Sequence, residues 1–410
     1  MLYKEIQKCR ICKGKDLDLI LNLGVHCLAG RFPARDEPDP PKVPLELVKC
    51  KDCHFVQLKH TVVSDVLYQK YGYRSGLNNT MKNHLQNLVD EIKQIVSLDK
   101  NDIVLDIGSN DATLLRCYQI PTLRKIGIDP LVNQFRNFYK NGIEGIPDYF
   151  TAEVFLKETR SRKARVVTSI AMFYDLDEPN VFVQDIKEIL DDDGIWVLEQ
   201  SYLPLMLERN SFDTICHEHL GYYALKQIDW LVKRNDLRIF RVIFNEINGG
   251  SFRVYICHDR SGYSTETGTI NKILSREKKM GLDSLKPYLE FNRRIAEIKE
   301  EITMFLENER KKGKKIYVYG ASTKGNTFLQ FCNINSQLIT AAADRNPEKW
   351  GCRTPGTNIP IISEEEARAA NPDYFLVLPW HFKDEFLKRE RSFLEGGGHF
   401  IFALPEFQVI

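Results

Sequence analysis

The sequence lacks any uninterrupted apolar stretch of the length that a membrane-spanning helix needs, which is about 20 residues. The first residues, MLYKEIQKCRICKGK, carry charge from the start and contain no apolar segment of the kind found in signal peptides. These absences argue against a membrane protein and against a secreted one. We therefore expect a soluble, cytoplasmic protein without a membrane partner.

The chain also lacks an excess of charge of either sign, since 57 Lys and Arg residues balance 56 Asp and Glu residues. Without a basic surplus there is no global electrostatic attraction for DNA, RNA or anionic lipid, so no nucleic-acid partner is expected. With 410 residues, 43% of them apolar and 11% aromatic, the composition is that of a globular protein of two or three domains.

Ten cysteines are present, but a reducing compartment disfavours disulfides, so thiols or metal ligands are expected. Cys9 and Cys12 form one CxxC pair, and Cys50 and Cys53 form a second. Two such turns supply four thiolates for a tetrahedral structural Zn²⁺, with no position left open for catalysis. The alternative is a redox motif, which typically has a single CxxC. Because the intervening FPARDEPDPPK has little apolar material, metal binding is expected to supply most of this module's folding energy.

The middle of the chain lacks the GxGxxG pattern of dinucleotide sites, although a strand, a turn and a helix follow one another there. The strand over 103–107 contains Asp106, and the next strand, KIGIDP, ends in Asp129, which suits the hydroxyl groups of a ribose. The candidate cofactor contacts in the turn are Gly108, Ser109, Asn110 and Asp111. A single glycine fits S-adenosylmethionine, which has no phosphate to bind; a plain α/β turn is the alternative.

Strands RVVTSIAMFY and GIWVLEQSY continue the alternation, separated by a helix over 180–190 and a turn over 192–194. This order predicts a doubly wound sheet, in which ligands lie at the carboxyl ends of the strands. Met172 and Asp175 follow such an end, so we expect both of them near the cofactor.

The densest chemical cluster is SFDTICHEH, which contains Cys216, Glu218 and His219 and is followed by Tyr222. Imidazole titrates near neutrality and is suited to removing a carbon-bound proton, while a neighbouring carboxylate can orient it or stabilise its charge. The HEH string lacks the spacing of helical zinc sites. A solvated turn without a function is the alternative.

The last third contains a helix over 285–312, the strand KKIYVYG and further strands that alternate with helices. The turn after KKIYVYG is not a P-loop, but small hydroxylated residues and a lysine at a helix start can bind an anion. Its candidate substrate contacts are Ser322, Thr323, Lys324 and Asn326. A capped helix start with a surface lysine is the alternative.

Four blocks in this order, CRIC…CKDC, DIGSND, HEH after SFDT, and YGASTKGNT, resemble the sugar C-methyltransferases that act on dTDP-linked 4-keto-sugars, including the TDP-sugar C-3 methyltransferases. The resemblance implies that the nucleotide sugar lies between the central and C-terminal domains. It implies His219 as the base, assisted by Glu218, and Tyr73 as an active-site residue, with Tyr71 as the alternative.

The chain departs from this family at three positions. Cys216 stands where a tyrosine is expected, Asp175 where the sugar C-3 enzymes have a histidine, and Ala112 where glycine is usual. The first two belong to the active-site region, so both count as candidate catalytic residues. They also leave open which sugar is used and which carbon is methylated.

The sequence thus predicts an α/β protein with a zinc-binding module over 1–75, a Rossmann-like S-adenosylmethionine methyltransferase domain over 76–280 and a Rossmann-like C-terminal domain over 281–410. The expected partner is a small-molecule nucleotide sugar, and a monomer is compatible with the sequence. Two alternatives remain open: an O- or N-methyltransferase for another acceptor, and a catalytically altered zinc-anchored nucleotide-binding protein.

Overall fold

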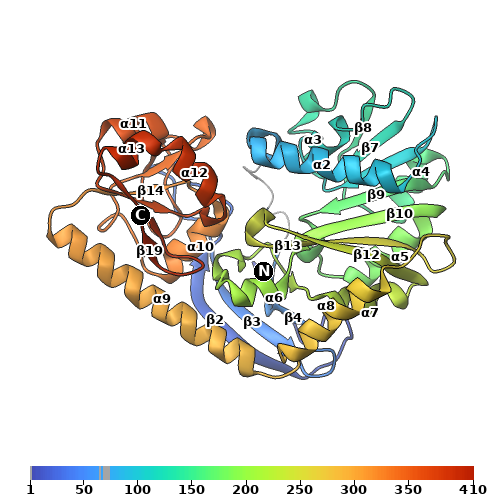
Figure 1. The fold of residues 1–410 in the computed structure, drawn as a ribbon, viewed down its shortest axis with the longest axis horizontal. Helices are drawn as coiled ribbons and strands as arrows, with labels where there is room; N and C mark the ends of the chain where they lie inside the picture. The colour runs from blue at the N-terminus through green and yellow to red at the C-terminus, as the bar shows by residue number, and fades with distance from the viewer. Residues whose placement is uncertain (1, 64–65, 68–73) are drawn as a thin grey trace.

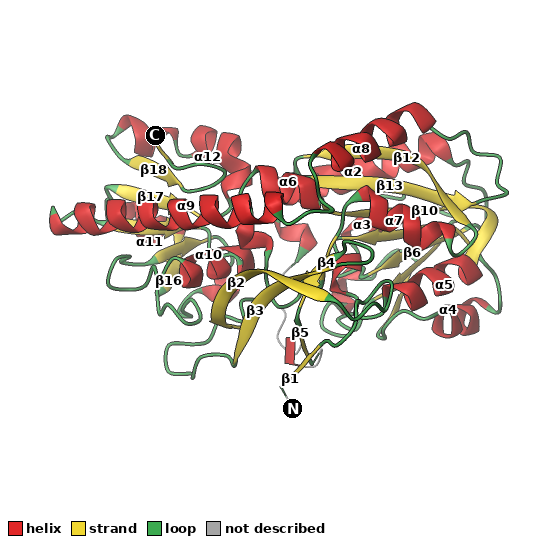
Figure 2. Ribbon diagram, turned by 90° about the horizontal axis from the view of Figure 1, so that it is seen from below, coloured by secondary structure: helices red, strands yellow, loops and turns green. Residues whose placement is uncertain are grey.

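The structure is a computed structural model that describes residues 2–63, 66–67 and 74–410. Two α/β units lie side by side, and a smaller β unit from the N-terminus lies between them on one side (Figure 1). The N-terminal strands β2 and β3 run from the C-terminal unit towards the central one, as both views show (Figures 1 and 2). Among the described residues, no helix combines the length and apolar character needed to span a bilayer.

The N-terminal unit is a sheet with strand order β11-β4-β3-β2, beside a small two-stranded ladder of β1 with β5. The fourth strand, β11, comes from the middle of the chain and pairs with β4. On either side of the stretch FPARDEPDPPK, β2 and β3 bury Ile20, Leu45 and Leu47 in a core shared with the C-terminal unit. The strands are β1 (Tyr3–Glu5), β2 (Leu17–Cys27), β3 (Lys42–Cys50), β4 (Val56–Leu58), β5 (His60–Val62) and β11 (Gly221–Tyr222).

The central unit is a seven-stranded sheet of order β12-β13-β10-β9-β6-β7-β8. The five strands from β10 to β8 are parallel, which confirms the predicted Rossmann-like alternation, whereas β13 pairs antiparallel with both β10 and β12. The turn predicted over 192–194 is instead an irregular part of β10. The strands are β6 (Ile103–Ile107), β7 (Arg124–Ile128), β8 (Ile143–Ile146), β9 (Ala164–Ile170), β10 (Leu190–Ser201), β12 (Leu237–Asn245) and β13 (Ser251–His258).

Helices cover the central sheet on both faces (Figure 1). The helix α2 places Leu85, Leu88, Val89 and Ile92 towards the sheet at the spacing expected of an amphipathic helix. The α-helices are α2 (Asn79–Ile95), α3 (Thr113–Arg116), α4 (Ala152–Thr159), α5 (Pro179–Ile189), α6 (Leu203–Glu208), α7 (Leu225–Lys233) and α8 (Thr267–Lys279).

The C-terminal unit has a six-stranded sheet of order β16-β15-β14-β17-β18-β19, parallel except for β19. The long helix α9 leads into it and packs beside β2, where the Asn292 side-chain amide donates to the Ile20 carbonyl at 2.6 Å. The strands are β14 (Ile316–Tyr319), β15 (Ala342–Asp344), β16 (Ile361–Ser363), β17 (Tyr374–Val377), β18 (His399–Phe402) and β19 (Gln408–Val409); the helices are α9 (Lys286–Lys311), α10 (Thr323–Phe331), α11 (Glu364–Ala369), α12 (Lys383–Arg389) and α13 (Arg391–Glu395).

Each α/β sheet has a point where its strand order reverses, at β6 between β7 and β9 and at β14 between β15 and β17. Loops at the carboxyl ends of such strands diverge and leave room for a ligand. Here the loops after β6 and β9 and the loops after β14 and β17 all line one cavity. The ligand-binding edges of the two sheets therefore open into a common space.

Arg10, which lies between the first two cysteines, ties the N-terminal unit to the central one. Its guanidinium is 2% exposed, pairs with Asp177 at 3.0 Å and donates to the Leu58 carbonyl at 2.6 Å. It also donates to the hydroxyl of Thr61 and the side chain of Gln57. These bonds offset the cost of burying the charge.

Replacing Arg10 with alanine should lower the free energy of unfolding by about 3 kcal/mol, the low end for a broken buried pair because Asp177 stays partly hydrated. Denaturant titration measures this change. Lys13→Ala is the matched control, since Lys13 and Glu178 are both about half exposed, and its effect should stay below about 1 kcal/mol. Equal effects of the two variants would contradict the role given to Arg10.

Candidate functional site

The cavity between the two α/β units has a volume of about 1060 Å³. Its wall brings together residues from three parts of the chain that are remote in sequence. The predicted site residues that line it are Asp106, Gly108, Ser109, Asn110, Asp129, Met172, Asp175, Cys216, Glu218, His219, Ser322, Thr323 and Lys324.

At the cofactor end, Asp129 is held in place by the backbone. Its carboxylate accepts hydrogen bonds from the N–H of Asn110 at 2.8 Å and of Leu131 at 2.7 Å. Gly108 has a φ of +71°, and a Cβ there would lie 3.1 Å from the Met172 side chain. Glycine at this position therefore permits the turn and its close approach to Met172.

Asp106 is buried below this turn and accepts a hydrogen bond from the Thr168 hydroxyl at 2.6 Å. Burial raises its pKa to about 7, although the Thr168 hydrogen bond lowers it. Asp111 has a different position, because it faces away from the cavity and accepts from the Gly76 N–H at 3.1 Å. Together with Asn110, which accepts from the Ser75 N–H, it anchors the segment before α2 to the turn.

The residues present fit S-adenosylmethionine. Asp129 lies at the end of β7, where its remaining lone pairs can accept from ribose hydroxyls. Gln200, which was not predicted from the sequence, lines the cavity at the end of β10 and is 1% exposed. Neither its side-chain oxygen nor its nitrogen has a hydrogen-bond partner among the described residues. A buried amide without a partner needs a hydrogen bond from a ligand or from water. In the sequence, the polar residue at the end of the strand GIWVLEQ could have indicated this position.

His219 faces the cavity with a defined tautomer. Its Nδ1 lies 2.7 Å from the Thr214 carbonyl oxygen, and since a carbonyl only accepts, Nδ1 carries the proton. Nε2 is left with its lone pair. Burial, together with the positive charge of Lys324, lowers the pKa of His219 to about 3, so the ring is neutral at physiological pH. The Thr214 carbonyl thus orients the imidazole through Nδ1.

Glu218 and Cys216 lie beside this histidine. Glu218 is 6% exposed, and a Cβ on Gly30 would lie 2.5 Å from its Oε1. Burial raises the pKa of Glu218 and of Cys216, and the pKa of Asp175 is also raised by burial, with the Glu218 charge adding to it. The Tyr174 ring, next to Asp175, lies 4.1 Å from the His219 ring between centroids.

The C-terminal wall contributes Lys324, whose ammonium donates to the Asn248 carbonyl at 2.9 Å. Burial lowers the pKa of this lysine. The preceding Ser322 caps α10, accepting from the Gly325 N–H at 3.0 Å. Two further cavity residues were not predicted from the sequence: Asp213, which accepts from the Trp380 indole at 3.0 Å, and His381, whose pKa burial lowers to about 3.

Some predicted residues lie elsewhere. Asn326 donates to the Ala29 carbonyl at 2.7 Å, joining α10 to the N-terminal unit, and does not line the cavity. Tyr222 is buried in β11 and does not line it either. The other histidine of the HEH string, His217, points to the Val43 carbonyl at 3.0 Å. Tyr71 and Tyr73 lie outside the described residues.

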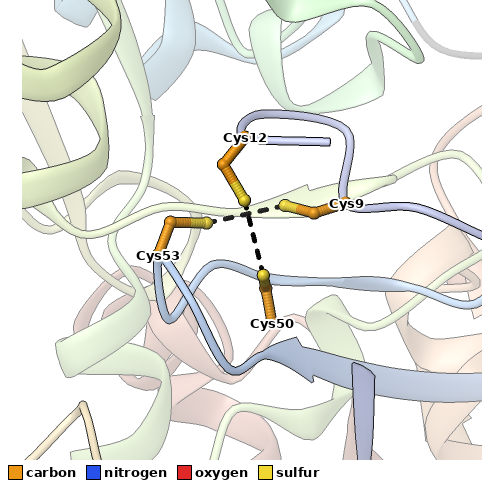
Figure 3. Close-up of side chains that lie close together, drawn as sticks. All are labelled: Cys9, Cys12, Cys50 and Cys53. Atoms are coloured by element: carbon orange, nitrogen blue, oxygen red, sulfur yellow. Dashed lines mark hydrogen bonds between the residues drawn. The ribbon is translucent and has the colours of Figure 1, made fainter. Parts of the chain in front are cut away.

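The four cysteines of the two CxxC pairs converge on one point (Figure 3). Their sulfur atoms all lie within 4.8 Å of one another, with Cys9 to Cys53 and Cys12 to Cys50 at 3.5 Å. Zinc–sulfur bonds of about 2.3 Å in a tetrahedron require sulfur separations of about 3.8 Å. The donor set and its geometry therefore fit Zn²⁺ bound by thiolates alone, which is a structural site.

Cys50→Ser should lower the zinc content from one ion per chain towards zero and the free energy of unfolding by about 3 kcal/mol or more, because a structural zinc contributes directly to folding. Atomic absorption and thermal unfolding measure the two effects. Cys352→Ser is the control, since that thiol lies outside the cluster, and it should keep its zinc. A Cys50→Ser protein with full zinc content would contradict the assignment.

Comparison with known proteins gives three matched family models along the chain. Residues 9–68 match a zinc binding domain, residues 78–242 a methyltransferase domain and residues 246–405 a C-methyltransferase C-terminal domain. The chain is 32% identical over 413 residues to C-methyltransferase NovU of Streptomyces niveus, an alignment that covers 100% of this chain and 98% of that protein.

Two solved structures can be aligned with part of the chain. Plantazolicin methyltransferase BpumL, solved with a pentazolic desmethylPZN analog and SAH, is 11% identical, covering 44% of this chain and 86% of that one with a TM-score of 0.36. Magnesium protoporphyrin IX methyltransferase ChlM from Synechocystis PCC 6803, with bound SAH, is 14% identical, covering 47% and 92% with a TM-score of 0.36.

The full-length relative and the methyltransferase and zinc binding domain models confirm the expected enzyme class and the two expected cofactors, S-adenosylmethionine and zinc. The chain belongs to the family of C-methyltransferases in which a zinc binding domain, a methyltransferase domain and a C-methyltransferase C-terminal domain follow one another.

Proposed function

We propose that the protein methylates the carbon beside the ketone of a nucleotide-linked, dTDP-type 4-keto-deoxysugar. The observation that carries the proposal is the shared cavity, which joins the cofactor turn at Gly108, the imidazole of His219 and the C-terminal turn at Lys324. In this proposal residues 1–75 form the zinc-binding module, 76–280 bind the methyl donor and 281–410 bind the nucleotide.

His219 acts as the base. A 4-keto group acidifies the neighbouring C–H because the resulting carbanion is delocalised as an enolate, so a positioned imidazole can remove this proton. The bond from Nδ1 to the Thr214 carbonyl leaves the Nε2 lone pair as the proton acceptor, and the same carbonyl stabilises the ring once it is charged. Of the two flanking histidines, only His219 lines the cavity.

Lys324 stabilises the enolate oxygen. Its ammonium makes one hydrogen bond, to the Asn248 carbonyl, and has no ion-pair partner within 4.0 Å among the described residues, although an ammonium has three donors. A partly buried cation with no carboxylate within 4.0 Å favours an anionic oxygen nearby, and a preformed donor is worth most where water is excluded. Thr323 and the N-terminus of α10 lie at the same wall and suit the phosphates of the nucleotide.

The methyl donor, when bound, supplies a methyl group on a positively charged sulfur. The chain's own contribution is to hold this donor at the turn after β6, with Asp129 placed for the ribose, and to orient the sugar carbon towards it. The identity to a C-methyltransferase supports carbon as the acceptor. Methylation of oxygen or nitrogen would not require a carbon base such as His219.

His219→Gln should reduce turnover about 10²- to 10⁴-fold, the usual contribution of a general base, while the affinity for S-adenosylmethionine stays within about twofold. Turnover and solvent-deuterium exchange at the carbon beside the ketone measure this, and both should fall together. His217→Gln is the matched control, because that ring points away from the cavity to Val43. Undiminished solvent-deuterium exchange in the His219 variant would show that His219 is not the base.

Gly30→Ala should lower kcat about tenfold or more, because the added Cβ would lie 2.5 Å from the Glu218 carboxylate and displace it beside the base. Steady-state kinetics on the keto-sugar would measure the loss. Gly262→Ala serves as the control, since a Cβ there meets nothing within 4 Å. Unchanged kinetics in the Gly30 variant would show that the position of Glu218 does not affect the reaction.

A further inference from the structure

Two side chains of the C-terminal unit, Lys324 and Trp380, donate hydrogen bonds to the central unit where the two units meet. The Lys324 ammonium donates to the Asn248 carbonyl at 2.9 Å, and the Trp380 indole N–H donates to the Asp213 carboxylate at 3.0 Å. Lys324, Asn248 and Asp213 all line the cavity. The part of the cavity wall around Lys324 is therefore complete only when the two units are in contact.

The turn that accepts from Lys324 lies directly against the Trp380 ring. Asn248, Gly249 and Gly250 have φ angles of +58°, +86° and +125°. A Cβ on Gly249 would lie 2.9 Å from the indole Cζ2, so glycine permits this close approach. The same indole thus contacts the turn and the Asp213 carboxylate, which fixes the carboxylate relative to the turn that binds Lys324.

Asp213 is a buried carboxyl group without a direct ion pair. It is 3% exposed, and within the described part of the chain no nitrogen of a lysine, arginine or histidine lies within 4.0 Å of it. Burial raises its pKa, whereas the charge of Lys324 and the hydrogen bond from Trp380 lower this pKa. Buried charges are normally compensated by charges or donors nearby. For Asp213 the compensating cation is Lys324, which acts from beyond ion-pair distance.

The titratable groups that interact electrostatically with Lys324 are Asp213, Cys216, His219 and His381. Burial, together with the charge of Lys324, lowers the pKa of both histidines to about 3, and burial raises the pKa of the Cys216 thiol well above its usual value. These three groups are therefore neutral at physiological pH. Burial also lowers the pKa of Lys324, and the charge of Asp213 opposes this effect.

We propose that Asp213 is a positioning residue, whose carboxylate is the counter-charge that holds the Lys324 ammonium in the cavity wall. The inference rests on the proposed function, in which this ammonium stabilises the enolate oxygen. Asp213 acts through Lys324 and needs no contact with the reacting atoms. It makes or breaks no bond in the reaction, and no proton passes between it and Lys324.

Asp213→Asn tests the proposal, because it keeps the shape of the side chain and an oxygen that can accept from Trp380 but removes the charge. Without the counter-charge the pKa of Lys324 falls, so the ammonium loses its proton at a lower pH. The alkaline limb of the pH profile of kcat/KM, which reports groups of the free enzyme, should therefore move down by about one pH unit or more. Below this limb kcat/KM should stay close to that of the wild-type enzyme.

A second measurement follows the protonation of Lys324 without any substrate. Acetic anhydride acetylates the neutral amine and not the ammonium, so the pH dependence of acetylation at Lys324, read by mass spectrometry of its peptide, gives the titration of this side chain. The labelling curve should move to lower pH in Asp213→Asn by the same amount as the alkaline limb.

Trp380→Phe is the matched control, since it removes the indole N–H, keeps the Asp213 charge and changes a residue that does not line the cavity. Its unfolding temperature should fall, because a buried carboxylate loses a donor. Its alkaline limb and its labelling curve should stay at the wild-type pH, because Asp213 remains ionised in alkaline solution. A purely structural role of Asp213 would instead give both variants the same pH profile.

A limb and a labelling curve that are the same in Asp213→Asn and in the wild-type enzyme would overturn the positioning role, and so would an equal shift in Trp380→Phe. Either result leaves the proposed function intact. If the wild-type enzyme neither methylates a nucleotide-linked 4-keto-sugar nor exchanges its carbon-bound hydrogen, the proposed function itself is refuted, and the labelling curves still decide whether Asp213 holds the charge of Lys324.

Discussion

Hydrogen bonds and an ion pair join the N-terminal unit to both α/β units and so set how the two units face each other. On one side, the Gln330 side chain of α10 accepts from the Cys27 N–H at 2.8 Å, and Asn326 donates to the Ala29 carbonyl. On the other side, Arg10 pairs with Asp177 of the central unit. Because the same short segment binds both, the two ligand-binding sheet edges are held towards one cavity, which neither unit could form alone.

The same unit also positions the loop that carries His219. The β11 strand pairs with β4, and His217 reaches the Val43 carbonyl of β3, so the residues on either side of His219 are anchored to the N-terminal sheet. His217 is held against β3 in this way, and the side chain of His219 faces the cavity. The cysteine cluster includes the turn that leads from β3 to β4 and does not line the cavity, so it supports the position of this loop from outside the cavity.

Electrostatically, the cavity has two different walls. Asp175 and Glu218 form an acidic part beside His219, and Lys324 contributes a positive charge from the C-terminal unit. Burial lowers the pKa of the lysine and raises that of both carboxyl groups, so it disfavours the charged form of each group. A substrate that brings the opposite charges to these places gains more from them than it would in water, and this favours selective binding.

Local features could be predicted from the sequence, because hydrophobic period, turn residues and motif spacing are short-range properties. They are the extent of β6 at 103–107, the two CxxC turns, the Asp129 strand end and the HEH loop. It did not determine which side chains meet. Gln200, Asp213 and His381 reach the cavity, whereas Asp111 and Asn326 bind other partners and Tyr222 is buried in β11. The antiparallel β13 joins a sheet predicted from its parallel strands. These outcomes were decided by packing between segments far apart in the chain, where β11 completes an N-terminal sheet and two strand-order reversals come to face each other. Hydrophobic patterning identifies the buried face of each element, but only the packed structure decides what that face is packed against.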